Sequence, residues 1–252
     1  MSRIYSSPDD PCNPLIDSES VSEFFNQRAN KISSIGPVQA VIYQDKNPEL
    51  AKKRNEAEKD KLLPLLGLDG SERVLDVGCG TGRWASDILP NCSWYHGFDA
   101  CDGLVTYARR TNLSSKCKFS TASADAFSLS SLGESEGFNR VLCAGVLIYL
   151  NDDEVVSALR CIFNVLAPAG RVLLREPMGL SRRLTISNHY SDELSQDYSA
   201  IYRTKTELLD MVKLAAGNLR ITLKDSGAVY DSPALNNRAD TRQHWMLLEQ
   251  SE

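Results

Sequence analysis

The chain contains 252 residues, of which 42% are hydrophobic and 24% are charged, a balance that is typical of a folded globular protein and excludes extensive disorder. Its 28 basic and 33 acidic side chains give a formal net charge of −5, which argues against a nucleic-acid partner because nucleic-acid-binding proteins carry a basic excess. The N-terminal residues contain no apolar signal sequence, and no apolar segment reaches the length of a membrane span, so no membrane partner is expected.

The seven cysteines are odd in number and include no CxxC pair. Cys79, Cys117, Cys143 and Cys161 lie in or beside apolar runs, where cysteine behaves as a small buried hydrophobic residue. The pattern predicts reduced thiols in a cytoplasmic protein, with neither disulfides nor a metal site.

A flexible arm and two helices are predicted in the N-terminal quarter of the chain. Residues 1–17 are rich in Ser, Pro and Asp, a composition typical of a flexible arm. A helix is predicted over Ser18–Asn30, because apolar residues recur there at helical spacing, with Ser18 or Ser20 as its cap. A second helix is predicted over Glu49–Leu66, and its charged run KKRNEAEKDK is interpreted as a solvated face.

From Arg73 onward, short apolar strands alternate with helices. Such alternation is typical of βαβ crossovers, which build a mainly parallel sheet with helices on both faces. We predict strands at Arg73–Gly78, Ser93–Phe98, Lys116–Ser120, Phe138–Ala144 and Gly170–Arg175, and helices at Arg83–Leu89, Gly103–Arg110 and Asp152–Leu166.

The C-terminal region completes this sheet. A helix is predicted over Thr206–Ala216, followed by strands at Leu219–Asp225 and Gln243–Leu248 with no helix between them. Two such consecutive strands favour an antiparallel pair at one edge. The expected fold is therefore α/β, a doubly wound and mainly parallel seven-stranded sheet preceded by a helical cap.

The first strand runs into a glycine-rich turn, RVLDVGCGTGR. A phosphate-binding P-loop is excluded, because Gly78 and Gly82 are too close together and no Lys-Ser/Thr follows. A dinucleotide fingerprint is not matched either, since Arg83 stands where its third glycine would be. The pattern begins instead with Asp76, whose carboxylate would repel a pyrophosphate and favours a cationic ligand.

These residues, with later ones in the same order, resemble the class I S-adenosylmethionine-dependent methyltransferases. Their acidic-GxGxG motif corresponds to Asp76-Val-Gly-Cys-Gly-Thr-Gly82, and the segments CAGVLIYLNDDE and LAPAGRVLLREP match the family's later motifs. The resemblance implies S-adenosylmethionine as cofactor, with Asp99 on the ribose hydroxyls and Asp125 on the adenine amino group. The core residues that it places at the cofactor are Asp76, Gly78, Cys79, Gly80, Gly82, Asp99, Ala100, Asp125, Ala126 and Ala144.

The same resemblance implies one methyltransferase domain over residues 18–252. Its parts would be a helical cap (18–66), a cofactor-binding core (67–176), and an acceptor-site insertion with the C-terminal strands (177–252). In the cap, Arg28 is predicted to reach the methionine carboxylate of the cofactor and Tyr43 to lie near its sulfonium, where a cation–π contact is favourable.

The acceptor site is predicted in the long segment Arg182–Arg203, which is too long for a simple connection. His189 is the candidate general base, because an imidazole titrates near neutral pH, whereas His96 and His244 lie in predicted strands and are interpreted as structural. Tyr202 is a second candidate catalytic residue. The predicted substrate-binding residues are Tyr149, Tyr190, Tyr198 and Arg203, the last as a partner for an anionic acceptor.

These features favour methyl transfer to a polar small molecule, in first place a hydroxyl of a sugar or natural-product intermediate, with an anionic or sugar-like acceptor as partner. Transfer to an amine of a small molecule or to a protein N-terminus is the alternative. The fourth strand is followed by Cys143-Ala-Gly-Val and not by a sequence of the Asn-Pro-Pro-Tyr type. This argues against methylation of a nucleobase nitrogen or an amide nitrogen. A non-catalytic cofactor-binding protein is a third hypothesis, against which the intact glycine motif and Asp99 argue. The oligomeric state and the acceptor are not predicted.

Overall fold

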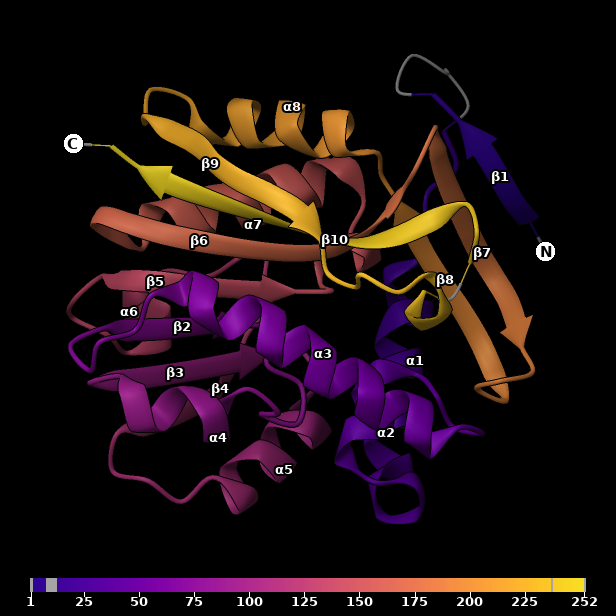
Figure 1. Cartoon of the computed structure of the whole chain (residues 1–252), viewed down its shortest axis with the longest axis horizontal. Coiled ribbons are helices and arrows are strands. Elements are labelled where there is room, and N and C mark those ends of the chain that lie inside the picture. Colours follow the sequence, from indigo (N-terminus) through magenta and orange to yellow (C-terminus); the bar gives the residue numbers. More distant parts are fainter. Residues whose placement is uncertain (1, 8–12, 237, 252) are drawn as a thin grey trace.

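The computed structural model describes residues 2–7, 13–236 and 238–251. A central seven-stranded sheet has the strand order β4-β3-β2-β5-β6-β10-β9, and helices cover both of its faces (Figure 1). Its strands are β2 (Arg73–Val77), β3 (Trp94–Asp99), β4 (Cys117–Thr121), β5 (Phe138–Ala144), β6 (Leu166–Gly179), β9 (Ile221–Ala228) and β10 (Thr241–Gln250).

Strands β2 to β6 are mutually parallel, and β10 lies antiparallel between β6 and β9. The predicted doubly wound sheet and its antiparallel C-terminal pair are therefore confirmed. The continuous apolar runs of β2 and β5 follow from burial on both faces, which a parallel sheet between two helical layers requires.

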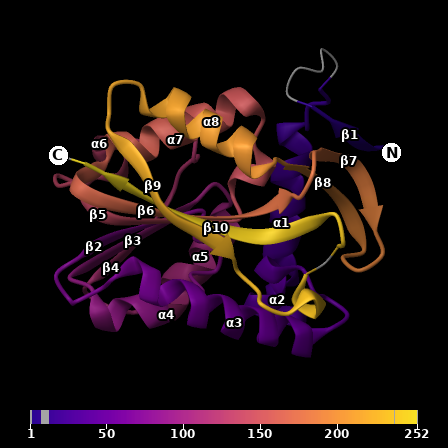
Figure 2. The same cartoon turned by 45° about the horizontal axis from the view of Figure 1, so that its top comes forward.

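Two hydrophobic clusters separate the sheet from its helical layers. One layer contains α3 (Pro48–Leu66), α4 (Ala85–Ile88) and α5 (Asp102–Thr111). The opposite layer contains α6 (Leu129–Leu132), α7 (Asp152–Asn164) and α8 (Lys205–Ala216), as the turned view in Figure 2 makes clear. Short 3₁₀ turns occur at η1 (Leu89–Asn91), η2 (Leu147–Tyr149) and η3 (Pro233–Leu235).

A second, three-stranded sheet lies beside the cap and corrects the predicted flexible arm. The segment Ser2–Ser6 forms strand β1, which pairs antiparallel with β7 (Arg183–Ser191), and β7 pairs in turn with β8 (Gln196–Tyr202). The hydroxyl of Tyr5 also donates to Asp240 at 2.5 Å. The polar composition of the arm does not reveal this strand, because its partners lie far away in the sequence. Residues 8–12 of the predicted arm, Cys12 included, are outside the described residues.

The cap consists of α1 (Ser18–Ile35), α2 (Pro37–Ile42) and the first half of α3. The side chain that caps α1 is Asp17, which accepts from the backbone N–H of Ser20 at 2.9 Å, so the prediction of Ser18 or Ser20 as cap is wrong. All three are good capping residues, and the extended backbone conformation of Asp17 decides the choice.

The charged run in α3 is not a uniformly solvated face, contrary to the prediction. Arg54 is 5% exposed and Glu58 is 0% exposed, because both continue the helical stripe of buried residues that ends in Leu62 and Leu66. Only the neighbouring faces of the helix, which carry Lys52 among others, are solvated. Within the described residues, no helix combines the length and the apolarity that crossing a membrane requires.

Candidate active site

A cavity of about 310 Å³ opens at the carboxyl ends of β2, β3, β5 and β6, under the helical cap. Ligands of doubly wound sheets bind at this edge, where the connections leave β2 toward opposite faces. Of the predicted site residues, the cavity is lined by Gly78, Cys79, Gly80, Asp99, Ala100, Asp125, Ala144, Tyr43, Tyr149, Tyr198 and Tyr202.

The glycine turn that follows β2 forms the floor of this cavity. Gly78, Gly80 and Gly82 all have positive φ angles, of 68°, 56° and 73°, which other residues adopt at a cost. Gly78 and Gly80 line the cavity, whereas Gly82 does not. A side chain at Gly82 would instead meet Ala108 of α5 at 3.2 Å, so this glycine allows the helix to pack against the turn.

Asp99 stands at the end of β3 as a preorganised acceptor. One of its carboxylate oxygens accepts from the N–H of Gly80 and the other from the N–H of Cys101, both at 2.9 Å. Burial raises its pKa, and these main-chain hydrogen bonds oppose that shift. Asp99 lines the cavity, and because each carboxylate oxygen can accept more than one hydrogen bond, the carboxylate can also accept from ribose hydroxyls.

Asp76 lies beneath the site and not in its wall, contrary to the prediction. The pleat of β2 directs its side chain toward Tyr95, whose hydroxyl donates to it at 2.5 Å. Burial raises the pKa of Asp76 to about 7, and the Tyr95 hydrogen bond only partly offsets this. Among the described residues that line the cavity, the acidic side chains next to the turn are those of Asp99 and Asp125. Ala126, which was also predicted at the cofactor, does not line the cavity.

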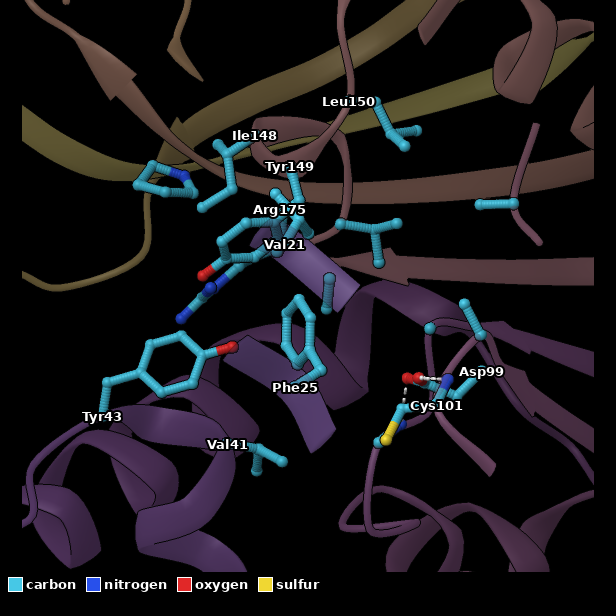
Figure 3. Close-up of a pocket in the computed structure, with 18 of the residues that line it drawn as sticks. Val21, Phe25, Val41, Tyr43, Asp99, Cys101, Ile148, Tyr149, Leu150 and Arg175 are labelled. Atoms are coloured by element: carbon cyan, nitrogen blue, oxygen red, sulfur yellow. Dashed lines mark hydrogen bonds between the residues drawn. The ribbon is translucent and has the colours of Figure 1, made fainter. Parts of the chain in front are cut away.

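Four tyrosine side chains from distant segments of the chain gather in the cavity, on the side away from Asp99. This tyrosine cluster comprises Tyr43 at the end of α2, Tyr149 in η2, and Tyr198 and Tyr202 on β8. The hydroxyls of Tyr198 and Tyr202 are 3.0 Å apart, and Phe25 of α1 packs edge-on against Tyr149 with 5.0 Å between ring centroids. Figure 3 shows Phe25, Tyr43 and Tyr149 converging on the same space.

Three phenols of the tyrosine cluster are held in the protonated state. Burial raises the pKa of Tyr43 to about 12 and those of Tyr149 and Tyr198 well above their usual value. At neutral pH these hydroxyls are therefore neutral hydrogen-bonding groups and not bases.

A second group of cavity residues is cationic. This arginine group comprises Arg54, Arg83 and Arg175, gathered around Glu58 of α3 and the phenol of Tyr230. Glu58 pairs with Arg83 at 3.0 Å and with Arg175 at 2.5 Å. The guanidinium of Arg175 lies beside Tyr149 in Figure 3, so the arginine group adjoins the tyrosine cluster.

Two residues predicted at the acceptor do not line the cavity. His189 follows a bulge in β7 and pairs across the small sheet with Tyr198, and the neighbouring Tyr190 is 52% exposed. Neither reaches the cavity, so the structure does not support His189 as a base acting there. The bulge begins at Asn188, whose φ of 46° shifts the alternation of the strand, and local sequence did not reveal it.

Arg203 and Arg28 were predicted to bind ligands, but both are buried in structural networks. Arg203 donates to both Asp152 and the carbonyl of Leu147, at 2.6 and 2.8 Å, and thereby fixes η2 to the end of β8. Arg28 pairs with Asp45 at 2.6 Å and donates to the carbonyl of Ala40. Arg203 also donates to the carbonyl of Leu150, next to Tyr149, and the guanidinium of Arg28 lies 5.4 Å from the centroid of the Tyr43 ring.

The sequence prediction missed the arginine group. Two signals in the sequence were available. One is Arg175, a charged residue at the end of the apolar strand in VLLREP, and the other is the i, i+4 pair Arg54 and Glu58 on the buried stripe of α3. The remaining histidines agree with their structural interpretation: His96 is buried between Glu134 and Ser120, and His244 lies in β10. The six described cysteines are all free thiols, and no group of metal-binding side chains occurs among the described residues.

Comparison with known proteins agrees with this geometry. The family model described as "Methyltransferase domain" matches residues 74–170. Phosphoethanolamine N-methyltransferase 1 of Triticum aestivum is 25% identical over 146 residues, which are 56% of this chain and 29% of that protein. The chain thus spans less than a third of the length of this curated relative.

Solved structures share the fold at low sequence identity. Phosphoethanolamine N-methyltransferase 1 of Haemonchus contortus, in complex with phosphoethanolamine and S-adenosylhomocysteine, superposes with a TM-score of 0.70 and 16% identity, over 94% of this chain and 50% of that one. Magnesium protoporphyrin IX methyltransferase from Synechocystis, with bound S-adenosylmethionine, superposes with a TM-score of 0.62 and 14% identity, over 95% of this chain and 100% of that one. The [4+2]-cyclase SpnF superposes with a TM-score of 0.66 and 18% identity, over 94% of this chain and 98% of that one. This fold therefore also occurs in a protein named for different chemistry. Residues 74–170 thus match a methyltransferase domain, and the chain has the fold of the class I S-adenosylmethionine-dependent methyltransferases.

Proposed function

We propose that the protein transfers a methyl group from S-adenosylmethionine to a nitrogen atom of a small-molecule acceptor. The acceptor would bind between the tyrosine cluster and the arginine group, across the cavity from Asp99. This proposal keeps the methyl transfer predicted from the sequence but prefers the amine alternative to the hydroxyl acceptor.

The residues around the glycine turn fit the cofactor. Asp99 offers two anchored carboxylate oxygens to a ribose, the small residues Gly78, Gly80 and Ala144 leave room against the backbone, and Asp125 lines the neighbouring wall. When bound, S-adenosylmethionine supplies a methyl group activated by its sulfonium. The protein then has mainly to align a nucleophile and exclude water, which can account for much of the rate acceleration.

The observation that carries the choice of nitrogen is the protonation state of three phenols in the tyrosine cluster. A hydroxyl acceptor needs a base to take its proton during transfer. No histidine occurs among the described residues that line the cavity. Its carboxylates are Asp99 and Asp125, which lie next to the glycine turn, and Glu154, which accepts from the N–H of Asn151. The pKa values of Tyr43, Tyr149 and Tyr198 are raised far above neutrality. An amine in its neutral form already carries the lone pair, so it makes the smaller demand on this cavity.

Aromatic side chains also suit the product of such a reaction. Methylated ammonium groups bind well to the faces of aromatic rings, and Phe25, Tyr43 and Tyr149 provide three rings around one space. The Triticum aestivum and Haemonchus contortus relatives are both named for N-methylation of phosphoethanolamine, which is in keeping with this acceptor chemistry.

The test is methyl transfer with S-adenosylmethionine carrying a ¹³C-labelled methyl group, offered to matched amine and alcohol acceptors. We expect products with N–CH₃ and not O–CH₃ carbon resonances, and a kcat/KM that rises with pH toward the pKa of the amine. Tyr149→Phe should lower kcat/KM by about three- to tenfold through the loss of one hydrogen bond. The matched control is Tyr190→Phe, which changes an exposed phenol outside the cavity. Exclusive formation of O–CH₃ products would contradict the proposal.

A further inference from the structure

We propose that the arginine group is an anion-binding subsite, which holds a phosphate or carboxylate group of the acceptor. The inference rests on the proposed function and narrows its substrate class to amines that carry an anionic group. The chemistry comes from residues that the sequence analysis did not assign to the acceptor.

The first argument is an imbalance of charge in a buried place. Three guanidinium groups, those of Arg54, Arg83 and Arg175, have a single carboxylate of the described residues within ion-pair distance, that of Glu58, which already pairs with two of them. Arg54 is 5% exposed, and no carboxylate of the described residues lies within ion-pair distance of it. Because a buried charge is costly unless it is paired, this surplus is best explained by an anion that arrives with a ligand.

The second argument is that the surplus charge is directed to the cavity. Arg54 and Arg175 both line it, together with the phenol of Tyr230, which interacts with both of them. The Nε of Arg54 donates to the carbonyl of Leu235 at 2.8 Å, while its two terminal nitrogens have no hydrogen-bond partner among the described residues. The guanidinium is thus anchored at one nitrogen and presents its remaining donors to a ligand.

The third argument is the position of the subsite relative to the nucleoside end of the cavity. Asp99 ends β3, Arg175 lies at a matching height in β6, and the intervening strands are β2 and β5. Three strand spacings separate the two side chains, or roughly 14 Å. Tyr43 lines the same cavity, and Figure 3 shows it and Arg175 together on the side away from Asp99. An anion at Arg54 and Arg175 is therefore on the acceptor side of the tyrosine cluster, away from the ribose.

The geometry also indicates which anions fit. Guanidinium groups hold phosphates and carboxylates through paired, parallel hydrogen bonds. Glu58 locks Arg175 and the carbonyl of Leu235 locks Arg54, so little conformational freedom is lost when the anion binds.

The experiment is calorimetric titration of the full chain, saturated with S-adenosylhomocysteine, with inorganic phosphate and separately with acetate at constant ionic strength. We expect at least one of the two anions to bind at a single site. Arg54→Gln should weaken that binding at least about tenfold, and Arg54→Lys, which keeps the charge but not the planar fork, should weaken it less. The matched control, Arg220→Gln, removes an exposed arginine outside the cavity and should leave the affinity unchanged.

Three results would overturn the inference: neither anion binds the saturated protein, the anion competes with S-adenosylhomocysteine, or Arg54→Gln binds the anion as tightly as the wild type. Competition would mean that the arginine group serves the carboxylate of the cofactor. Retained affinity of each variant for S-adenosylhomocysteine demonstrates that it is folded. Failure of the wild type to bind S-adenosylhomocysteine would instead refute the proposed function, so the two failures are distinguishable.

A second arm connects the subsite with turnover. Aminoethyl phosphate, β-alanine and ethanolamine carry the same amine with a phosphate, a carboxylate or neither. We expect ethanolamine to have a KM at least about tenfold above the better of the two anionic amines, and Arg54→Gln to abolish that preference. Equal KM values for all three amines would contradict the inference.

Discussion

The two halves of the cavity are built in different ways. The nucleoside half comes mainly from the turn after β2 and the end of β3, joined by Asp125 after β4 and Ala144 at the end of β5, and main-chain N–H groups hold its key side chain, Asp99. The acceptor half is assembled from α1, α2, α3, η2, β6, β8 and the segment before β10, and side-chain ion pairs hold it together. The proposed cofactor site thus depends mainly on local backbone geometry, whereas the proposed acceptor site depends on long-range packing.

The largest effect should come from breaking the ion-pair network of the acceptor half. Glu58→Gln removes the only carboxylate partner of Arg83 and Arg175 among the described residues and leaves buried guanidinium charges unpaired. We expect the free energy of unfolding to fall by roughly 3 kcal/mol in urea denaturation. Glu56→Gln on the same helix changes an exposed pair, with Lys52 at 4.0 Å, and should cost less than about 0.5 kcal/mol. Equal stability of the two variants would mean that the network does not hold the acceptor half.

The next effect should be confined to the nucleoside half. Asp99→Ala removes the acceptor for the Gly80 and Cys101 N–H groups and for the proposed ribose hydroxyls. We expect the affinity for S-adenosylhomocysteine to fall roughly 10- to 100-fold in calorimetry. Asp102→Ala removes an exposed carboxylate three residues further on and serves as the control. Unchanged affinity in Asp99→Ala would remove this residue from the cofactor site.

Beneath the nucleoside half, Asp76 should make the stability of the ligand-free protein depend on pH. Its folded-state pKa of about 7 lies above the usual value of 3.8, so the folded protein retains a proton that the unfolded chain releases between these values. The stabilising contribution of the protonated form is fully present below about pH 4 and is lost as the pH rises through 7. Asp76→Asn cannot titrate, so the wild type should lose roughly 2 kcal/mol relative to this variant between pH 5 and pH 8. Parallel pH profiles of the two proteins, measured by urea denaturation, would contradict a raised pKa for Asp76.

The smallest effect is expected for the residue that the sequence favoured as the base. His189 lies on β7 outside the cavity, so His189→Ala should change kcat less than about twofold and leave its pH profile unaltered. The measurement is the steady-state rate with the best amine acceptor. A large loss of kcat with intact S-adenosylhomocysteine binding would bring His189 back into the chemistry.

The success of the sequence prediction follows the same division between the two halves. The strands of the core and the place of Asp99 were predictable, because apolar runs, glycine spacing and strand ends are local patterns. His189 and Arg203 were assigned to the acceptor from the length of their segment and from side-chain chemistry, and the structure places one beyond a bulge and the other in an ion pair with Asp152. The partners that determine those positions lie 50 or more residues away or depend on a one-residue shift in strand pairing, neither of which local sequence reports.

The sequence by itself determined the alternation of strands and helices, the glycine turn and the carboxylate at the end of β3, because each depends on neighbouring residues and on the handedness of βαβ connections. Only the tertiary structure decided that Arg54 and Glu58 are buried, that Asp76 faces Tyr95, and that four tyrosines meet. These outcomes depend on which segments pack together across the sheet, and packing determines whether a charged or phenolic side chain lies in solvent, in the core or at the ligand.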